Sequence, residues 1–226
     1  MQALHPPVHR SRRPAGPLAV FALLSTTAIA SAQTPVLVKD IVGGTLPSSP
    51  QMMMTVGGTT FFRASDGATG FELWKSDGTA AGTTRVKDIE PGPGGSDIGS
   101  MTRVGTTLFF TANTGSAGIE LWRSDGTAEG TFLLRDIRKG SESSNLHLFT
   151  ARGDSLIFIA DDGRYGNQLW RTDGSPAGTV RLTRGPAPAT GSACLWECGR
   201  FGFAGDRLLY TAADPEHGEE PWLYTE

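Results

Sequence analysis

The chain has 226 residues, a formal net charge of −3, 30 glycines and 14 prolines. Without the three arginines of residues 1–32, the chain has 17 basic and 23 acidic side chains. This negative balance argues against nucleic acid and anionic membrane surfaces as partners. The length allows one sizeable core, and many turn residues with few charges are typical of an all-β protein.

Residues 1–32 have the pattern of a secretory signal peptide. Three arginines precede an apolar run at 18–30, which is too short to span a bilayer comfortably. Small residues before the bond between Ala32 and Gln33 predict cleavage there. We therefore expect a secreted, periplasmic or cell-surface protein with no transmembrane segment after cleavage. An uncleaved N-terminal anchor and a twin-arginine signal are the alternatives.

The stretch GFELWKSDGTAAGTTRVKDI at 70–89 recurs through the chain. It returns at 118–137 and at 166–183, and a shorter copy, GEEPWLYTE, occupies 218–226. The repeated tryptophans are 48, 48 and 52 residues apart, namely Trp74, Trp122, Trp170 and Trp222. Repeats of roughly 40–50 residues, rich in β-branched and aromatic residues, predict a β-propeller with one blade per repeat.

The repeats predict an all-β fold, a four-bladed β-propeller of four-stranded antiparallel blades. The segment before the first full repeat matches the end of a repeat, since Asp40 lies 48 residues before Asp88. We expect the strand 36–41 to pair with 219–224 and complete the last blade, because an open strand edge leaves backbone N–H and C=O groups unpaired. The single domain spans 33–226, with repeat units of approximately 42–89, 90–137, 138–184, and 185–226 together with 35–41.

Each repeat should contain four strands, which we call a to d from the axis outward, with the tryptophan on strand c. The turn between strands c and d carries an aspartate followed by glycine in three copies, at Asp77, Asp125 and Asp173. An aspartate in such a turn accepts hydrogen bonds from backbone N–H groups one or two residues on, while the glycine takes a left-handed conformation. A calcium loop is the alternative, but it needs about six oxygen ligands, and one aspartate with a few hydroxyls is too few.

The motif ELWxSDGTxxGT resembles that of the ELWxxDGT repeat proteins, a family of mostly long, secreted bacterial proteins that is frequent in myxobacteria. Three copies match well, ELWKSDGTAAGT, ELWRSDGTAEGT and QLWRTDGSPAGT, and the resemblance covers nearly all of 35–226. It implies a secreted repeat protein and no particular reaction, because the family has no established one. Two departures are Gln168 in place of glutamate and the sequence Glu220-Pro221-Trp222 in the fourth copy.

Two sets of repeated side chains have a structural and a functional interpretation. The tryptophans are either sugar-stacking platforms or wedges between blades, and we favour wedges because they recur in every copy. The residues two positions before them form either a carboxylate ring that binds a cation or hydrogen bonds to neighbouring turns. We favour hydrogen bonds because strand c lies far from the axis. These residues are Glu72, Glu120, Gln168 and Glu220.

The loops between strands b and c and between d and a differ from copy to copy, whereas the other turns are repeated. In a four-stranded blade both variable loop sets emerge on the same end of the propeller, so we expect recognition of a partner there. The b–c loops are 65–70, 113–118, 161–166 and 213–218, and the d–a loops are 90–97, 138–145 and 183–199.

The candidate binding residues lie in these loops of the last two repeats: Trp196, Tyr165, Asp162, Asp214, Glu216 and His217. Carboxylates with one histidine suit a divalent ion, but a solvated acidic loop is the simpler interpretation, and we assign no metal ligand. Cys194 and Cys198 are the only two cysteines, and in a secreted chain we expect them to form a disulfide that presents Trp196. A zinc site would need further ligands such as His217.

We predict a non-catalytic secreted propeller that binds a protein or a cell-surface glycan. The chain has none of the motifs HExxH, GxSxG or GxxxxGK[ST], so we assign no catalytic residue and expect no cofactor. One alternative is a hydrolase or lyase with a site at the loop end of the central channel, which requires two ionisable side chains within about 5–10 Å. Another is a structural or adhesive surface protein with a cation in the channel, which requires inward-facing oxygens from several blades.

Overall fold

The computed structural model describes residues 34–183, 201–214 and 216–224. The chain divides into two units, Met1–Val36 and Leu37–Glu226, and all the strands belong to the second unit. Among the described residues, no helix has the length and apolar character that crossing a membrane requires.

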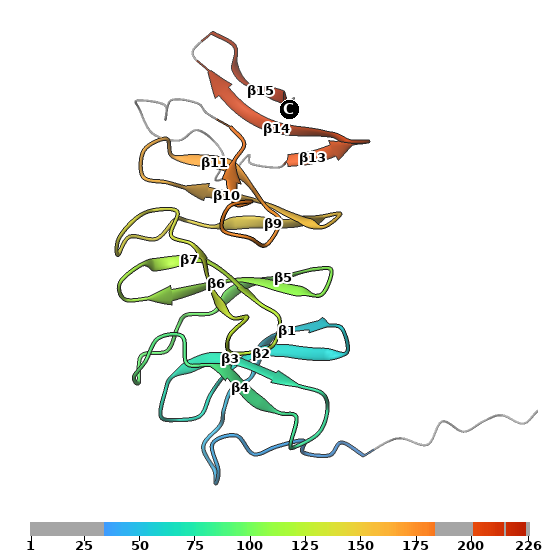
Figure 1. Cartoon of the computed structure of the whole chain (residues 1–226), viewed down its shortest axis with the longest axis vertical. Coiled ribbons are helices and arrows are strands. Elements are labelled where there is room, and N and C mark those ends of the chain that lie inside the picture. The colour runs from blue at the N-terminus through green and yellow to red at the C-terminus, as the bar shows by residue number, and fades with distance from the viewer. Residues whose placement is uncertain (1–33, 184–200, 215, 225–226) are drawn as a thin grey trace, which may run out of the picture. The chain divides into compact units, whose positions relative to one another are not determined.

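Antiparallel sheets follow one another in chain order (Figure 1), which confirms the predicted all-β, β-propeller-like architecture. The first sheet consists of β1 (Gln51–Val56), β2 (Thr59–Ser65), β3 (Phe71–Ser76) and β4 (Thr84–Lys87). The second consists of β5 (Gly99–Val104), β6 (Thr107–Thr114), β7 (Gly118–Ser124) and β8 (Phe132–Arg135). The third consists of β9 (His147–Arg152), β10 (Ser155–Asp161), β11 (Asn167–Thr172) and β12 (Val180–Arg181). The fourth has three strands among the described residues, β13 (Phe201–Ala204), β14 (Arg207–Asp214) and β15 (Gly218–Tyr224).

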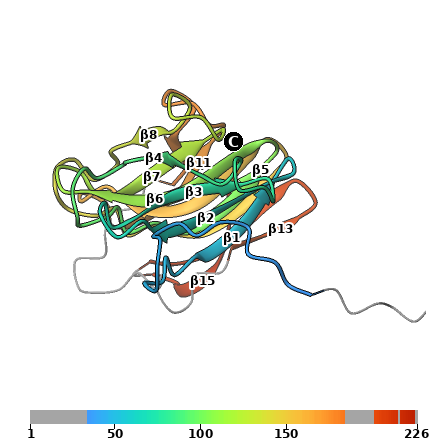
Figure 2. The ribbon, with the colours of Figure 1, turned by 90° about the horizontal axis from the view of Figure 1, so that it is seen from below.

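The core lies between successive sheets, and strands of neighbouring sheets lie over one another in Figure 2. Trp122 of the second sheet belongs to a buried cluster with Phe61 and Leu73 of the first sheet. Trp170 of the third sheet joins Phe109 and other residues of the second sheet in the same way. The second strands are apolar on both faces because a neighbouring sheet covers each side.

A kink recurs where the first strand of each of the first three sheets begins. Non-glycine residues with positive φ occur there in two series with a spacing of 48 residues: Ser49, Asp97 and Asn145, and Met52, Ser100 and Leu148. The pairing register with the second strand also shifts at this point in all three sheets. The recurrence identifies a β-bulge that redirects the chain from the incoming loop into the sheet.

The predicted pairing of 36–41 with 219–224 is not present in the structure. Residues 34–50 contain no strand, and β15 is an edge strand of the fourth sheet. The segment does hold one repeated contact, because Lys39 Nζ donates to Thr83 O at 2.7 Å. Lys87 and Arg135, which lie 48 and 96 residues later, donate to the equivalent carbonyls of the next sheets at 2.6 and 2.5 Å. Lys39 thus contacts the first sheet in the way that the fourth strand of one sheet contacts the next sheet.

Candidate functional site

The loops between the sheets are hydrogen-bonded to one another at one end of the strands. Ser96, in the loop from β4 to β5, donates its backbone N–H to Phe71 O at 3.0 Å and accepts one from Asn113 of the next sheet at 2.6 Å. The next repeat has the same pair of bonds around Ser144. Each loop is therefore fixed to its own sheet and to the following one. We call this side of the sheets the loop end, which comprises residues 66–70, 88–98, 115–117, 136–146 and 162–166.

A buried glutamate anchors each of the first two d–a loops from inside the sheet. The Glu120 side chain is 0% exposed and accepts hydrogen bonds from the backbone N–H groups of Ile137 and Arg138, at 3.1 and 3.3 Å, and from Ser144 Oγ. Glu72 makes equivalent bonds to a backbone N–H and a serine 48 residues earlier in the chain. Burial raises the pKa of both carboxyl groups, that of Glu120 to about 7.

The third and fourth repeats depart from this pattern at the same position. Gln168 Nε2 donates to Tyr165 O at 2.9 Å, and its Oε1 accepts a hydrogen bond from Thr183 at 2.8 Å. Glu220 is exposed. These side chains therefore bond to local loops or face solvent, and the described residues give no sign of a carboxylate ring.

The aspartate of each repeated turn bonds within its own turn. Asp125 Oδ1 accepts hydrogen bonds from Thr127 N at 2.8 Å and from Thr127 Oγ1 at 2.7 Å, and these bonds lower the pKa of Asp125 below its usual value. Asp77 and Asp173 form the same pair of bonds and have lowered pKa values for the same reason. The three aspartates thus stabilise the turns.

Two guanidinium groups enclose Tyr165 in the b–c loop of the third sheet. The guanidinium carbons of Arg181 and Arg164 lie 4.0 and 4.9 Å from the ring centroid. Asp162 accepts hydrogen bonds from Arg181 at 2.5 Å and from Tyr165 N at 3.0 Å. Its equivalent in the first sheet, Asp66, pairs with an arginine in the same way. Asp162 therefore has a local structural partner, and Tyr165 presents a partly buried ring at the loop end.

The structure describes only some of the remaining candidate residues. Asp214 ends β14, and Glu216 and His217 are exposed in the turn before β15. The His217 ring lies edge-on to Trp222, with 6.4 Å between ring centroids. Within 34–183, 201–214 and 216–224, no group of three His, Cys, Asp or Glu side chains could hold a metal ion. Trp196, Cys194 and Cys198 lie outside the described residues, so their predicted contact and disulfide stay predictions.

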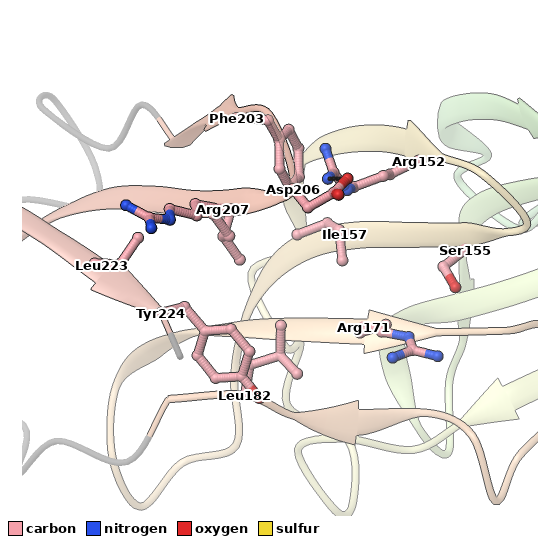
Figure 3. A pocket seen from close by; sticks show the side chains of 11 residues that line it. Arg152, Ser155, Ile157, Arg171, Leu182, Phe203, Asp206, Arg207, Leu223 and Tyr224 are labelled. Carbon is pink, nitrogen blue, oxygen red and sulfur yellow. Dashed lines mark hydrogen bonds and ion pairs between the residues drawn. The ribbon is translucent and has the colours of Figure 1, made fainter. Parts of the chain in front are cut away.

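A pocket of about 640 Å³ lies between the third and fourth sheets, at the end of the strands opposite the loop end (Figure 3). Six polar or aromatic residues line much of it, namely Arg152, Arg171, Arg207, Asp206, Phe203 and Tyr224. Apolar walls come from residues such as Ile157 and Leu182. Among the described residues, Leu208 is the buried member that the fourth sheet contributes to the cluster between these sheets.

Our sequence prediction missed this pocket because it placed recognition at the loop end. One sequence feature was available, namely a cation directly after the tryptophan in three repeats, at Lys75, Arg123 and Arg171, where the fourth repeat has Leu223. That pattern shows a repeated cation but does not show which residues of the neighbouring sheet line a pocket with it.

Comparisons with known proteins give a distant likeness in structure alone. A scan against protein-family models finds no match, and a search of curated proteins finds no relative. Two crystal structures of puromycin hydrolase are similar at 18% sequence identity, one of them an S511A mutant complexed with PGG. The alignments cover 74% and 76% of this chain with TM-scores of 0.43 and 0.44. This chain spans about a quarter of the length of those proteins.

Proposed function

We propose that the mature chain is a secreted, non-catalytic binding scaffold whose loop end recognises a protein or a cell-surface glycan. The observation that carries this proposal is the hydrogen bonding of the loop end, where loops of different sequence are held on a repeated framework by Glu72, Glu120 and the serines they bind. Varied loops on a rigid scaffold are the usual location of binding residues in repeat proteins.

Two further features support a binding role over a catalytic one. The carboxyl groups of raised pKa are enclosed between sheets and bonded to loop backbone, where a substrate would not reach them. Tyr165 offers a ring held by two arginines, and rigid aromatic side chains are favourable contact residues because they lose little entropy on binding. The repeated sequence motif supports placing the chain among the ELWxxDGT repeat proteins.

The proposal is tested by screening the mature chain, residues 33–226, on a glycan array and in pull-down experiments. We expect at least one glycan or protein to bind, and we expect Trp196→Ala and Tyr165→Ala to weaken that binding about tenfold. The matched control is Val180→Ala, an exposed apolar residue on β12 outside the loop end. Binding that persists unchanged in both loop variants would contradict recognition at the loop end.

We also propose that the segment 36–41 completes the fourth sheet of the same chain and closes a four-bladed propeller. Lys39 supports this, because its contact with the first sheet is the one that Lys87 and Arg135 make from fourth strands. Leu37 is 81% exposed, and Leu223 on β15 is 42% exposed, so both have apolar surface that pairing would cover. Pairing would also satisfy the open backbone edge of β15.

A cysteine pair tests the closure. In the first sheet Lys75 pairs with Thr84, and the repeat places Leu223 and Val36 at the equivalent positions. We expect the double variant Val36→Cys and Leu223→Cys to form a disulfide within one chain under mild oxidation, detected by peptide mass mapping. The control pair, Val36→Cys with Val180→Cys, should not form one. Disulfides between chains, shown by mixing isotope-labelled and unlabelled protein, would contradict closure within a chain.

A further inference from the structure

The chain contains five Asp-Gly dipeptides, and all five lie in turns and loops that the structure describes. Aspartate followed by glycine is prone to isomerisation, because glycine has no side chain to shield its backbone nitrogen. In that reaction the glycine nitrogen forms a bond to the aspartate Cγ, and a hydroxyl group of the carboxylic acid leaves as water. Hydrolysis of the resulting succinimide on its other side gives an isoaspartate, which adds a methylene group to the main chain. The five aspartates are Asp66, Asp77, Asp125, Asp162 and Asp173.

The glycine nitrogen of each dipeptide donates its hydrogen to the side chain of the residue just before the aspartate. Gly67 N donates to Ser65 Oγ at 3.1 Å, and Gly78 N donates to Ser76 Oγ at 3.0 Å. The acceptors at the other three dipeptides lie at 3.0, 3.0 and 2.8 Å and are Ser124 Oγ, Thr172 Oγ1 and Asp161 Oδ1. Each bond fixes the plane of the peptide group, and this plane has to turn before the nitrogen can attack Cγ.

The carboxylate of each aspartate is bonded to the chain beyond the glycine. Asp77 Oδ1 accepts hydrogen bonds from Thr79 N at 2.9 Å and from Thr79 Oγ1 at 2.7 Å. The same carboxylate fills the space beside Gly82, because a Cβ built on that glycine would overlap it. Asp66 and Asp162 accept from the backbone N–H groups two and three residues on, at 2.8–3.0 Å. These bonds have to break before Cγ can turn toward the glycine nitrogen.

The charge of the carboxyl groups acts in the same direction as this geometry. Succinimide formation proceeds from the neutral acid, because a carboxylate has no hydroxyl group to lose. Hydrogen bonds lower the pKa of four of the carboxyl groups below the usual value and so keep them ionised at neutral pH, namely those of Asp66, Asp77, Asp125 and Asp173. The fifth, Asp162, is ion-paired through Oδ2 with Arg181 at 2.5 Å.

We propose that these turns protect all five aspartates from isomerisation, with the side-chain oxygen before each aspartate holding the glycine nitrogen away from Cγ. The serine, threonine or aspartate at that place is therefore a positioning residue, and the motif [STD]-Asp-Gly keeps the main chain of the turn at its original length. Two of the turns, at Asp66 and Asp162, belong to the loop end. The proposal concerns the chemistry of the chain itself, so it does not depend on recognition there.

Slow ageing of the mature chain at neutral pH and body temperature tests the proposal. One sample is folded and the other is unfolded in concentrated urea, and isoaspartate at each dipeptide is measured over weeks by peptide mass mapping and by enzymatic methylation. At least three hydrogen bonds hold each dipeptide, and each slows the reaction by a factor of about five. We therefore expect isoaspartate to form about a hundredfold more slowly at each site in the folded chain than in urea.

Single serine variants separate local protection from the stability of the whole fold. Ser76→Ala should speed isomerisation at Asp77 by about fivefold, and Ser65→Ala should do the same at Asp66, because each removes the acceptor of one glycine N–H. The dipeptides that keep their acceptors are internal controls in the same sample and should keep the wild-type rate. The matched control variant is Ser155→Ala, whose serine lies outside the Asp-Gly turns and which should change no site.

Three outcomes would overturn the proposal. The first is isomerisation in the folded chain at the rate seen in urea, and the second is an unchanged rate at both Asp66 and Asp77 in their own serine variants. The third is an equal rise at all five sites in a single variant, because protection would then come from global stability and not from the local bond. None of these outcomes involves a partner, so binding at the loop end stands or falls by its own experiment.

Discussion

Replacing Gly95 with alanine is expected to destabilise the fold by about 3 kcal/mol or more. Gly95 has φ +73°, and a Cβ there would lie 2.4 Å from Phe71 N and 2.9 Å from Phe71 O. An L-residue is strained at this φ, and the clash is with backbone, which cannot rotate away. The loop would have to leave β3, and the hydrogen bond from Ser96 N to Phe71 O would be lost. Chemical denaturation gives the change in free energy of unfolding.

The neighbouring glycine provides the control for this prediction. Gly94 has no heavy atom within 4 Å of a built Cβ and does not have a positive φ. We expect Gly94→Ala to change the free energy of unfolding by no more than about 0.5 kcal/mol, as for other open surface sites. Equal denaturation midpoints for the two variants would show that the close approach of the loop to β3 is absent in solution.

Replacing Glu120 with glutamine is expected to cost about 2 kcal/mol at pH 5, because a buried N–H donor would lose its acceptor. The carboxyl oxygens accept from Ile137 N, Arg138 N and Ser144 Oγ. At pH 5 the hydroxyl oxygen of the neutral acid can still accept an N–H, whereas the amide nitrogen of glutamine can only donate. Gln168 holds the same position in the third sheet, where Tyr165 O accepts a hydrogen bond from its amide. The matched control is Glu129→Gln, an exposed glutamate in the turn of the same repeat.

The difference between wild type and Glu120→Gln should depend on pH with a definite sign. The pKa of Glu120 is raised in the folded protein from 4.5 to about 7, so the folded state binds more protons between these values, and wild-type stability falls as pH rises through that range. Glutamine does not titrate, so the advantage of wild type should shrink between pH 5 and pH 8, by up to about 3 kcal/mol. Urea denaturation of both proteins at several pH values measures it. A difference that grows with pH would mean that the buried carboxyl group prefers its charged form.

The strands and turns could be predicted well from the sequence. The three repeated Asp-Gly turns and the loops between them bounded the strands of the first three sheets to within a few residues. This succeeded because turn chemistry and strand pairing between neighbours depend on residues that are close in the sequence. The resemblance to a repeat family implied a secreted protein but did not indicate any reaction.

The candidate site was predicted only in part. Tyr165 and Asp162 lie in the loop that the sequence indicated, but their contacts with arginines were not predicted, because Arg181 lies on a different strand and its direction depends on the fold of the loop. The pocket was missed because its lining residues come from two different sheets, which single repeats do not bring together.

The sequence by itself determined the repeat, the sheets and the turns, since these follow from patterns within about 20 residues. The tertiary structure alone decided that the described fourth sheet has three strands, that Lys39 contacts the first sheet as a fourth-strand residue contacts the next sheet, and that Arg171 lines a pocket together with residues of the fourth sheet. The physical reason is that these features arise between sheets 48 or more residues apart, where side-chain volume and the space left by a neighbour determine which groups meet.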